Sequence, residues 1–350
     1  MQLFITGATG FIGSWLVRYF AAGGRPPMAS GRGDPPSSLL DLAGYLRADI
    51  CRPMATVGAD VVIHAAALAS DSATAPALKA ANIHGTRHVF EATRDCKIFL
   101  YISSSSVYDN RNTAHVEDEP VDYRHLSPYG LSKRLAEDWL LQQDWRRRTL
   151  VILRPRAVYG PGDRVLLPRL LRLRRRGRIV IPGDLRVQSA LTYVGNLCQA
   201  VAACLVYFEK HPGGAHCFNV SDAEPYEMRD VVGNLLSAVY GDQMPFREIP
   251  VLPLSVAARV LEWLRIPAPF TRFGLAAATQ NSVMNIEKIN QIIGFQPEKN
   301  LWEVLPDIGA WANAVGLPAV QAGAADLPWN KVTGTLFIPP DACPLPLKGS

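Results

Sequence analysis

The chain has few cysteines and few histidines, and neither residue type is arranged for disulfide or metal chemistry. Its six cysteines are spread over 350 residues without a Cys-x-x-Cys pair, so we predict reduced thiols and a cytoplasmic protein. His84 and His88 have the spacing of two metal ligands on one helix face, but no third ligand lies nearby in the sequence. We therefore predict no metal site.

Long apolar runs are missing as well. The most apolar long window, residues 191–208, contains Asn196 and Gln199 and falls short of a membrane span. A strand pattern begins next to Met1, so we expect no signal peptide.

Charge of one sign is in only slight excess, with a formal net charge of +5. Much of it lies between Arg169 and Arg178, where leucines are interspersed with arginines. We interpret this stretch as the solvated face of a helix that ends at Gly177. Aromatic residues are not interleaved with the arginines, so we predict no nucleic-acid partner.

The strongest positive signal lies in the first thirteen residues. A short apolar run, residues 3–5, precedes three glycines at a spacing of three, Gly7, Gly10 and Gly13, and an apolar helical pattern follows. A strand, a glycine-rich turn and a helix N-terminus together form a site for a pyrophosphate. Because the required strand and helix are both present, the triplet predicts dinucleotide binding.

Further strands and helices alternate along the chain, with strands expected near residues 27–30, 46–50, 59–67 and 98–102. This alternation predicts an α/β fold, a doubly wound parallel Rossmann sheet with a smaller, mostly helical C-terminal substrate lobe. We place the dinucleotide-binding domain in residues 1–180, with return segments near 190–210. An interleaved substrate lobe covers 181–316, and 317–350 form an irregular Pro- and Gly-rich tail.

An apolar, roughly amphipathic helix is expected at residues 251–264, within the lobe. Such a helix could line an apolar substrate pocket, touch a membrane surface, or pack on the core of its own lobe. The sequence leaves all three open.

The tip of the second strand normally decides which nicotinamide cofactor fits. An acidic residue there binds the ribose 2′-hydroxyl, whereas an arginine accommodates a 2′-phosphate. Arg32 lies at this position and no acid occurs before Asp34, so NADP(H) is favoured. Asp34 would take the ribose role if the strand register slips, which keeps NAD(H) as the alternative.

Two polar segments carry the candidate chemistry. The strand at 98–102 runs into four serines, residues 103–106, at the sheet edge where a ligand should lie. Tyr129 and Lys133 follow, one helical turn apart on the same face. A neighbouring ammonium lowers the pKa of a phenol from its ordinary value of about 10, so Lys133 can prepare Tyr129 for proton transfer.

These motifs together resemble the extended short-chain dehydrogenase/reductase superfamily over about residues 1–312. They are residues 6–13, residues 64–67, Asn82, the serine cluster, the Tyr129–Lys133 pair and residues 154–162. The resemblance implies that Ser104 polarises the substrate oxygen and that Tyr129 is the general acid/base. Lys133 would hold the nicotinamide ribose and tune Tyr129. A homodimer is the expected assembly of such a protein.

The predicted cofactor contacts combine the glycine loop, the strand ends and the motifs of this resemblance. They are Gly7, Thr9, Gly10, Phe11, Ile12, Gly13, Arg32, Asp49, Ile50, Ala65, Ala66, Ala67, Asn82, Tyr129, Lys133, Pro155 and Val158. The predicted substrate contacts are Ser105, Ser106, Arg156 and Tyr193.

Departures from the superfamily's patterns narrow the reaction. Sugar-nucleotide dehydratases carry Asp-Glu where this chain has Ser105-Ser106. Sugar-nucleotide epimerases usually have Asn at the position of Ala157, and Arg-Asp where alignment places Ser189 and Ala190. Losing a cation at a diphosphate site argues against a UDP- or GDP-sugar. Residues 154–162 and 191–197 instead resemble the 3β-hydroxysteroid/sterol dehydrogenase branch, which handles hydrophobic alcohols, ketones and β-keto or β-hydroxy acids.

We therefore predict an NAD(P)-dependent oxidoreductase that interconverts a secondary alcohol and a ketone on a mainly apolar small-molecule substrate. One alternative is a sugar-nucleotide 4-epimerase with tightly bound NAD. The other is a redox sensor that binds NADP without catalysis, although such a sensor has no need of Ser104, Tyr129 and Lys133.

Overall fold

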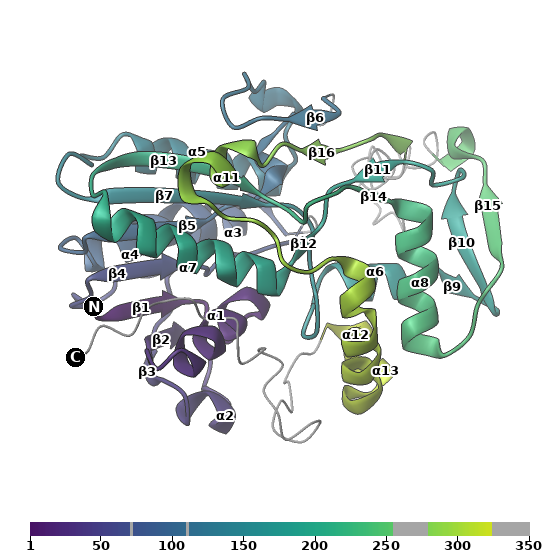
Figure 1. Cartoon of the computed structure of the whole chain (residues 1–350), viewed down its shortest axis with the longest axis horizontal. Helices are drawn as coiled ribbons and strands as arrows, with labels where there is room; N and C mark the ends of the chain where they lie inside the picture. Colours follow the sequence, from purple (N-terminus) through teal and green to yellow (C-terminus); the bar gives the residue numbers. More distant parts are fainter. Residues whose placement is uncertain (71–72, 110–111, 255–278, 324–350) are drawn as a thin grey trace.

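A seven-stranded, wholly parallel sheet forms the centre of the computed structural model, which describes residues 1–70, 73–109, 112–254 and 279–323 (Figure 1). The strand order is β13-β7-β5-β4-β1-β2-β3, a doubly wound arrangement, so the predicted fold class is confirmed. The strands are β1 (Leu3–Thr6), β2 (Met28–Gly31), β3 (Gly44–Arg47), β4 (Val61–His64), β5 (Ile98–Ile102), β7 (Thr149–Pro155) and β13 (Gly214–Val220).

Helices cover both faces of this sheet because successive strand residues point to opposite sides. Ile5 belongs to the core under α1 (Phe11–Ala22) and α7 (Val194–Lys210), whereas its neighbour Phe4 belongs to the core under α4 (Gly85–Ala92) and α5 (Pro128–Leu141). Every residue of β1, β4, β5 and β7 is buried. Burial on both faces explains why these strands appear in the sequence as continuous apolar runs.

The second part of the molecule, on the right of Figure 1, mixes helices with a three-stranded sheet. Its helices are α6 (Leu166–Leu171), α8 (Met228–Tyr240), α12 (Leu301–Val315) and α13 (Leu317–Ala322), and its sheet has the order β15-β10-β9. The chain leaves the main sheet after β7, enters this part, and returns through α7 and β13. The helical C-terminal part was predicted; the small sheet was not.

Short elements complete the connections within and between the two parts. They are α2 (Ser37–Leu40), α3 (Ala75–Leu78), η1 (Lys79–His84), η2 (Ser105–Val107), β6 (Ala114–His115), η3 (Tyr123–His125), β8 (Val158–Tyr159), β11 (Gln188–Ser189), β12 (Thr192–Tyr193), β14 (Tyr226–Glu227), β16 (Val283–Met284) and α11 (Glu287–Ile293).

The interpretation of the basic stretch as one helix face is wrong. The helix α6 ends at Leu171, and the arginines that follow form a β-hairpin of β9 (Arg174–Arg175) and β10 (Arg178–Pro182). Arg176 and Gly177 adopt positive φ values of 49° and 73° at its turn, which a helix cannot accommodate. Pairing of β10 with β15 (Phe246–Ile249), far along the chain, stabilises the hairpin.

The expected irregular tail also begins later than residue 317. Gly316 ends α12 at a φ of 88°, and the next helix, α13, begins at Leu317. Val320 is buried, which anchors α13 against the core. The tail beyond residue 323 lies outside the described residues.

The described ranges bear on three further expectations. Of the helix predicted at 251–264, only 251–254 are described. None of the helices within these ranges combines the length and apolar composition needed to cross a bilayer. The five described cysteines are free thiols, and no cluster of metal-ligating side chains occurs in the same part of the chain.

Candidate active site

The glycine loop between β1 and α1 has no room for side chains at two of its three glycines. Gly7 adopts a φ of 72°, and a Cβ on it would stand 2.7 Å from the Ala66 Cα atom. A Cβ on Gly13 would stand 2.1 Å from the Gly7 carbonyl oxygen. The loop is therefore pressed against the residues that follow β4. Tight turning and close backbone approach are what a pyrophosphate site requires, so these residues fit a dinucleotide.

Hydrogen bonds from other parts of the chain secure this loop. Phe11 and Ile12, in the first turn of α1, are half-buried. The Ala8 amide donates to the Ser30 carbonyl of β2 over 2.9 Å. A guanidinium nitrogen of Arg164 donates to the Thr9 carbonyl over 2.8 Å. This arginine was not predicted, although it lies two residues after the 154–162 motif and places a cation beside the loop.

At the end of β2, Arg32 is exposed and Asp34 is already engaged. Asp34 forms an ion pair of 2.9 Å with Arg47, and both side chains are largely exposed. Ser30 Oγ is buried without a hydrogen-bond partner among the described residues. The charged Arg32 side chain and the Ser30 hydroxyl, which has no partner among the described residues, thus both lie at the end of β2, where the ribose contact was predicted.

Two of the predicted cofactor contacts, Asp49 and Ile50, follow β3. The Cys51 amide donates to Asp49 over 3.0 Å, and this bond lowers the pKa of the Asp49 carboxyl. Ile50 packs so closely on α4 that a Cβ on Gly85 would stand 2.8 Å from it.

The serine cluster continues the sheet at its carboxyl edge. The Ser103 amide donates to the Leu153 carbonyl of β7 over 2.7 Å, which ties the cluster to the neighbouring strand. Ser104 Oγ accepts from the Ser106 amide at 3.1 Å and lies 3.2 Å from Ser106 Oγ. Ser103 Oγ is buried without a partner within the described ranges.

Helix α5 carries Tyr129 and is pressed onto the serine cluster. Ser127 caps the helix by accepting from the Gly130 amide over 3.0 Å, and Pro128 occupies its first turn. A Cβ on Gly130 would stand only 2.0 Å from the Ser106 carbonyl oxygen. Tyr129, which directly precedes Gly130 in this helix, is half-buried.

Lys133 is buried at the centre of the site. Its Nζ donates to the Ile102 carbonyl over 2.7 Å and lies 4.0 Å from the centre of the Tyr101 ring. Burial lowers the pKa of Lys133 to about 7, against the opposing effect of the Glu137 carboxylate. A small change in the surroundings can therefore change whether Lys133 is protonated at neutral pH.

Asn82 fastens α5 to the loop after β4. Its Oδ1 accepts from the Leu68 amide over 2.8 Å, and its Nδ2 donates to the Leu68 carbonyl and to Ser132 Oγ, the latter over 2.8 Å. Ser132 Oγ in turn donates to the Tyr129 carbonyl over 2.7 Å. Asn82 lies in a π-helical turn, η1, a distortion common at functional sites.

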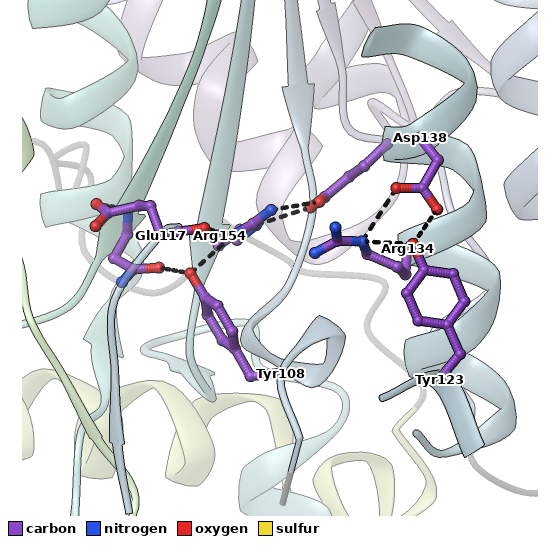
Figure 2. Close-up of polar contacts among 8 residues, drawn as sticks. Tyr108, Glu117, Tyr123, Arg134, Asp138 and Arg154 are labelled. Carbon is purple, nitrogen blue, oxygen red and sulfur yellow. Dashed lines mark hydrogen bonds and ion pairs between the residues drawn. The ribbon is translucent and has the colours of Figure 1, made fainter. Parts of the chain in front are cut away.

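A buried ion pair fastens the same helix from the opposite side. Arg154 of β7 donates to both carboxylate oxygens of Glu137, over 3.1 and 2.7 Å, and the two side chains are only 4% and 0% exposed. Another guanidinium nitrogen donates to the Tyr108 hydroxyl and the Glu117 carbonyl, both over 2.9 Å (Figure 2). Arg154 therefore connects β7, α5 and the segment that follows the serine cluster.

A second, more exposed network lies on α5 beside it. Arg134 donates to Asp138 Oδ1 over 3.1 Å, and the Tyr123 hydroxyl donates to Asp138 Oδ2 over 2.7 Å (Figure 2). These bonds attach η3 to the outer face of the helix.

Comparison with known proteins places this geometry in a family. The family described as "NAD dependent epimerase/dehydratase family" matches residues 3–220. The chain belongs to this family. The resemblance to extended short-chain dehydrogenases/reductases and the prediction of an NAD(P)-dependent enzyme are thus confirmed.

Relatives with named activities are oxidoreductases. The 2-alkyl-3-oxoalkanoate reductase of Stenotrophomonas maltophilia (strain K279a) is 30% identical over 329 residues, which cover 87% of this chain and 97% of that protein. The decarboxylating sterol-4-alpha-carboxylate 3-dehydrogenase of Schizosaccharomyces pombe is 25% identical over 242 residues, covering 66% and 71%. They support an oxidoreductase and the sterol dehydrogenase-like branch.

A solved epimerase structure has the same fold. The UDP-glucuronic acid 4-epimerase from Bacillus cereus, in complex with NAD, aligns with a TM-score of 0.68 and 21% identity over 90% of this chain and 99% of that one. At this identity the likeness establishes the fold alone.

The side chains predicted to contact the substrate differ in how deeply they are buried and in their hydrogen-bond partners. Ser105 is buried, whereas Ser106 is half-buried. Arg156 follows Pro155 at the end of β7, and its Nε lies 3.3 Å from Ser189 Oγ. Val158 pairs with β12 in the next short strand.

Tyr193 is enclosed by the core instead. Its ring centre lies 6.0 Å from that of Trp15 and 5.8 Å from that of Tyr159, and the side chain is buried. These contacts are those of a packing residue, so the substrate proposal below depends on other side chains.

Proposed function

We propose that this protein interconverts a secondary alcohol and a ketone on a mainly apolar substrate, with NAD(P) as hydride carrier. The observation that carries the proposal is the packing of α5 on the serine cluster, seen in the close approach of Gly130 to Ser106. This packing supports a site in which the Tyr129 phenol, the Ser104 hydroxyl and the buried Lys133 ammonium act together at the carboxyl edge of the sheet. The names of the two relatives, a 3-oxoalkanoate reductase and a sterol 3-dehydrogenase, support this reaction type.

Each of the three side chains has a separate task. Ser104 Oγ donates a hydrogen bond to the reacting oxygen and fixes its direction. Tyr129 exchanges a proton with that oxygen, and the Lys133 ammonium favours the phenolate form of Tyr129. The bound nicotinamide supplies or accepts the hydride. In the oxidative direction, the alcohol proton leaves through Tyr129.

NADP(H) is the proposed cofactor, held by the glycine loop and by Arg32 at the 2′-phosphate. The exposed Arg32 has no hydrogen bond or ion pair to another described residue, whereas Asp34 is paired with Arg47. An arginine that is free to pair favours the phosphate, and an acid that already has a partner is less available to a ribose hydroxyl.

Exchange of Tyr129 for phenylalanine tests the proposal. We expect Tyr129→Phe to lower turnover of long-chain secondary alcohols roughly 10²–10⁴-fold, with little change in cofactor affinity, because only the proton-transfer group is lost. Turnover is followed by NADPH absorbance and affinity by titration calorimetry. The matched control is Tyr123→Phe, which removes a hydroxyl from the same helix region but on its outer face.

Two outcomes would contradict the proposal. Retained activity in Tyr129→Phe would remove this residue from the mechanism. Interconversion of UDP-sugars by wild-type protein, without oxidation of any secondary alcohol, would establish the epimerase alternative instead.

A further inference from the structure

Arg156 is a largely buried cation that has no acidic partner among the described residues. Its Nε has a single side-chain contact, Ser189 Oγ at 3.3 Å. In the parts of the chain that the structure describes, no carboxylate forms an ion pair with it, and burial alone lowers its pKa, to about 10. The side chain is therefore still charged at neutral pH. Burying a charge of this kind costs free energy unless an anion pairs with it.

The neighbouring groups do not supply that anion. His115 is close enough for the charge of Arg156 to help lower the pKa of His115, although burial contributes most. Glu119 is engaged elsewhere, since it accepts from His115 Nδ1 over 3.0 Å and from the Val116 amide over 3.2 Å. Ser189 Oγ is therefore the side-chain contact of the guanidinium among the described residues, and Glu119 already has its own partners.

Hydrogen bonds between the Arg156 backbone and Thr192 hold the residue at the carboxyl end of β7. The Arg156 amide donates to Thr192 Oγ1 over 3.0 Å, and the same hydroxyl donates back to the Arg156 carbonyl over 2.9 Å. The next residue, Ala157, is exposed and has a φ of 41°. A non-glycine residue seldom adopts this region, and such strain is concentrated at ligand sites.

Arg156 is also close to the predicted reacting centre. Ile102 of β5 is in register with Leu153 of β7, and the bond from the Ser103 amide to the Leu153 carbonyl continues the ladder. Ser104 and Arg156 therefore follow adjacent strand ends, about 5 Å apart in the sheet direction. In a substrate whose anionic group binds Arg156, that group lies only a few bonds from the reacting carbon.

We propose that Arg156 and Ser189 form a subsite for a substrate carboxylate located β to the reacting carbon, so that the substrate is a 3-hydroxy or 3-oxo acid. A planar guanidinium matches a carboxylate with two parallel hydrogen bonds. A diphosphate is disfavoured because Ser189 occupies the position at which sugar-nucleotide enzymes of this superfamily carry their phosphate-binding arginine. This inference rests on the proposed alcohol–ketone chemistry.

The first experiment measures binding, so that its result does not depend on turnover. The NADP⁺-loaded protein is titrated calorimetrically with a 2-alkyl-3-hydroxyalkanoate and with its methyl ester, which differ only in the carboxylate charge. We expect the wild type to bind the acid more tightly than the ester. Arg156→Gln should lose roughly 10–10²-fold in acid affinity while ester affinity changes little, because one charge-assisted contact is removed. Arg156→Lys should retain part of the difference. Arg186→Gln, the loss of an exposed arginine, is the matched control.

The second experiment measures kcat/KM for the same pair of compounds and for the secondary alcohol without a carboxylate. A wild type that oxidises the ester and the alcohol as well as the acid would overturn the subsite and leave the proposed function standing. Failure to oxidise any of them would overturn the proposed function, whereas the calorimetric difference would still decide the subsite. Equal losses for acid and ester in Arg156→Gln, or UDP-glucose binding that this variant abolishes, would refute carboxylate recognition.

Discussion

The buried pair Arg154–Glu137 should behave as one unit in folding. Replacing either partner alone leaves the other as an uncompensated charge among side chains that are 4% and 0% exposed. Breaking such a pair costs about 3–5 kcal/mol. We therefore expect Glu137→Leu and Arg154→Met each to lower the free energy of unfolding by about that amount.

The double replacement should cost much less than the sum of the two. It removes both desolvation penalties and loses chiefly the donations from Arg154 to Tyr108 and Glu117, at about 1 kcal/mol each. We expect a double variant about 2 kcal/mol less stable than wild type, hence a coupling free energy of at least about 4 kcal/mol.

Urea unfolding followed by tryptophan fluorescence measures this coupling, with Trp139 and Trp145 as reporters in the core under α5. The Arg134–Asp138 pair on the same helix, with side chains 20% and 25% exposed, is the control. Its cycle should give less than about 1 kcal/mol. Additive effects at Arg154 and Glu137 would refute the argument that each charge depends on the other.

Two other expectations concern pH and cofactor choice. Burial lowers the pKa of His64 to about 3. As the pH falls through 6.5, His64 takes up a proton in the unfolded chain but not in the folded protein, so the free energy of unfolding decreases. Between pH 7.5 and 5 the loss from this group is about 2 kcal/mol. Urea titrations should show a flatter pH dependence in His64→Gln but not in His211→Gln, an exposed histidine; parallel curves would contradict this. In calorimetry, Arg32→Ala should weaken NADPH binding roughly tenfold and leave NADH binding unchanged; an equal effect on both cofactors would exclude 2′-phosphate recognition.

Much of the sheet could be predicted because local pattern and final environment agree. The strands β1, β4 and β5 are apolar runs in the sequence and are buried on both faces. The glycine loop was equally clear, since the steric demands at Gly7 and Gly13 arise from immediate neighbours and from the adjacent strand. The helical spacing of Tyr129 and Lys133 likewise follows from local geometry.

Features set by distant contacts were not predictable in this way. The arginine-rich stretch fits a helix pattern locally, and its pairing with residues near Phe246 makes it a hairpin. Nothing near Glu137 in the sequence shows that Arg154 is its partner, although an acid one turn after Lys133, on the buried side of α5, was a usable signal. That no acid within the described ranges pairs with Arg156 is visible only once the surrounding elements are assembled.

The path of the chain between the two parts limits how the molecule can be divided. A fragment ending at residue 180 would contain six of the seven strands of the sheet but neither α7 nor β13. It would expose the apolar side chains that α7 covers, including Val151 and Leu153, and would leave β7 as an open edge ready to pair with another chain. Such a fragment should aggregate instead of binding a dinucleotide. The sheet of the nucleotide-binding part is therefore completed only after the first segment of the second part, α6 with β9 and β10, has been made, whereas α8, β15, α12 and α13 follow later in the chain.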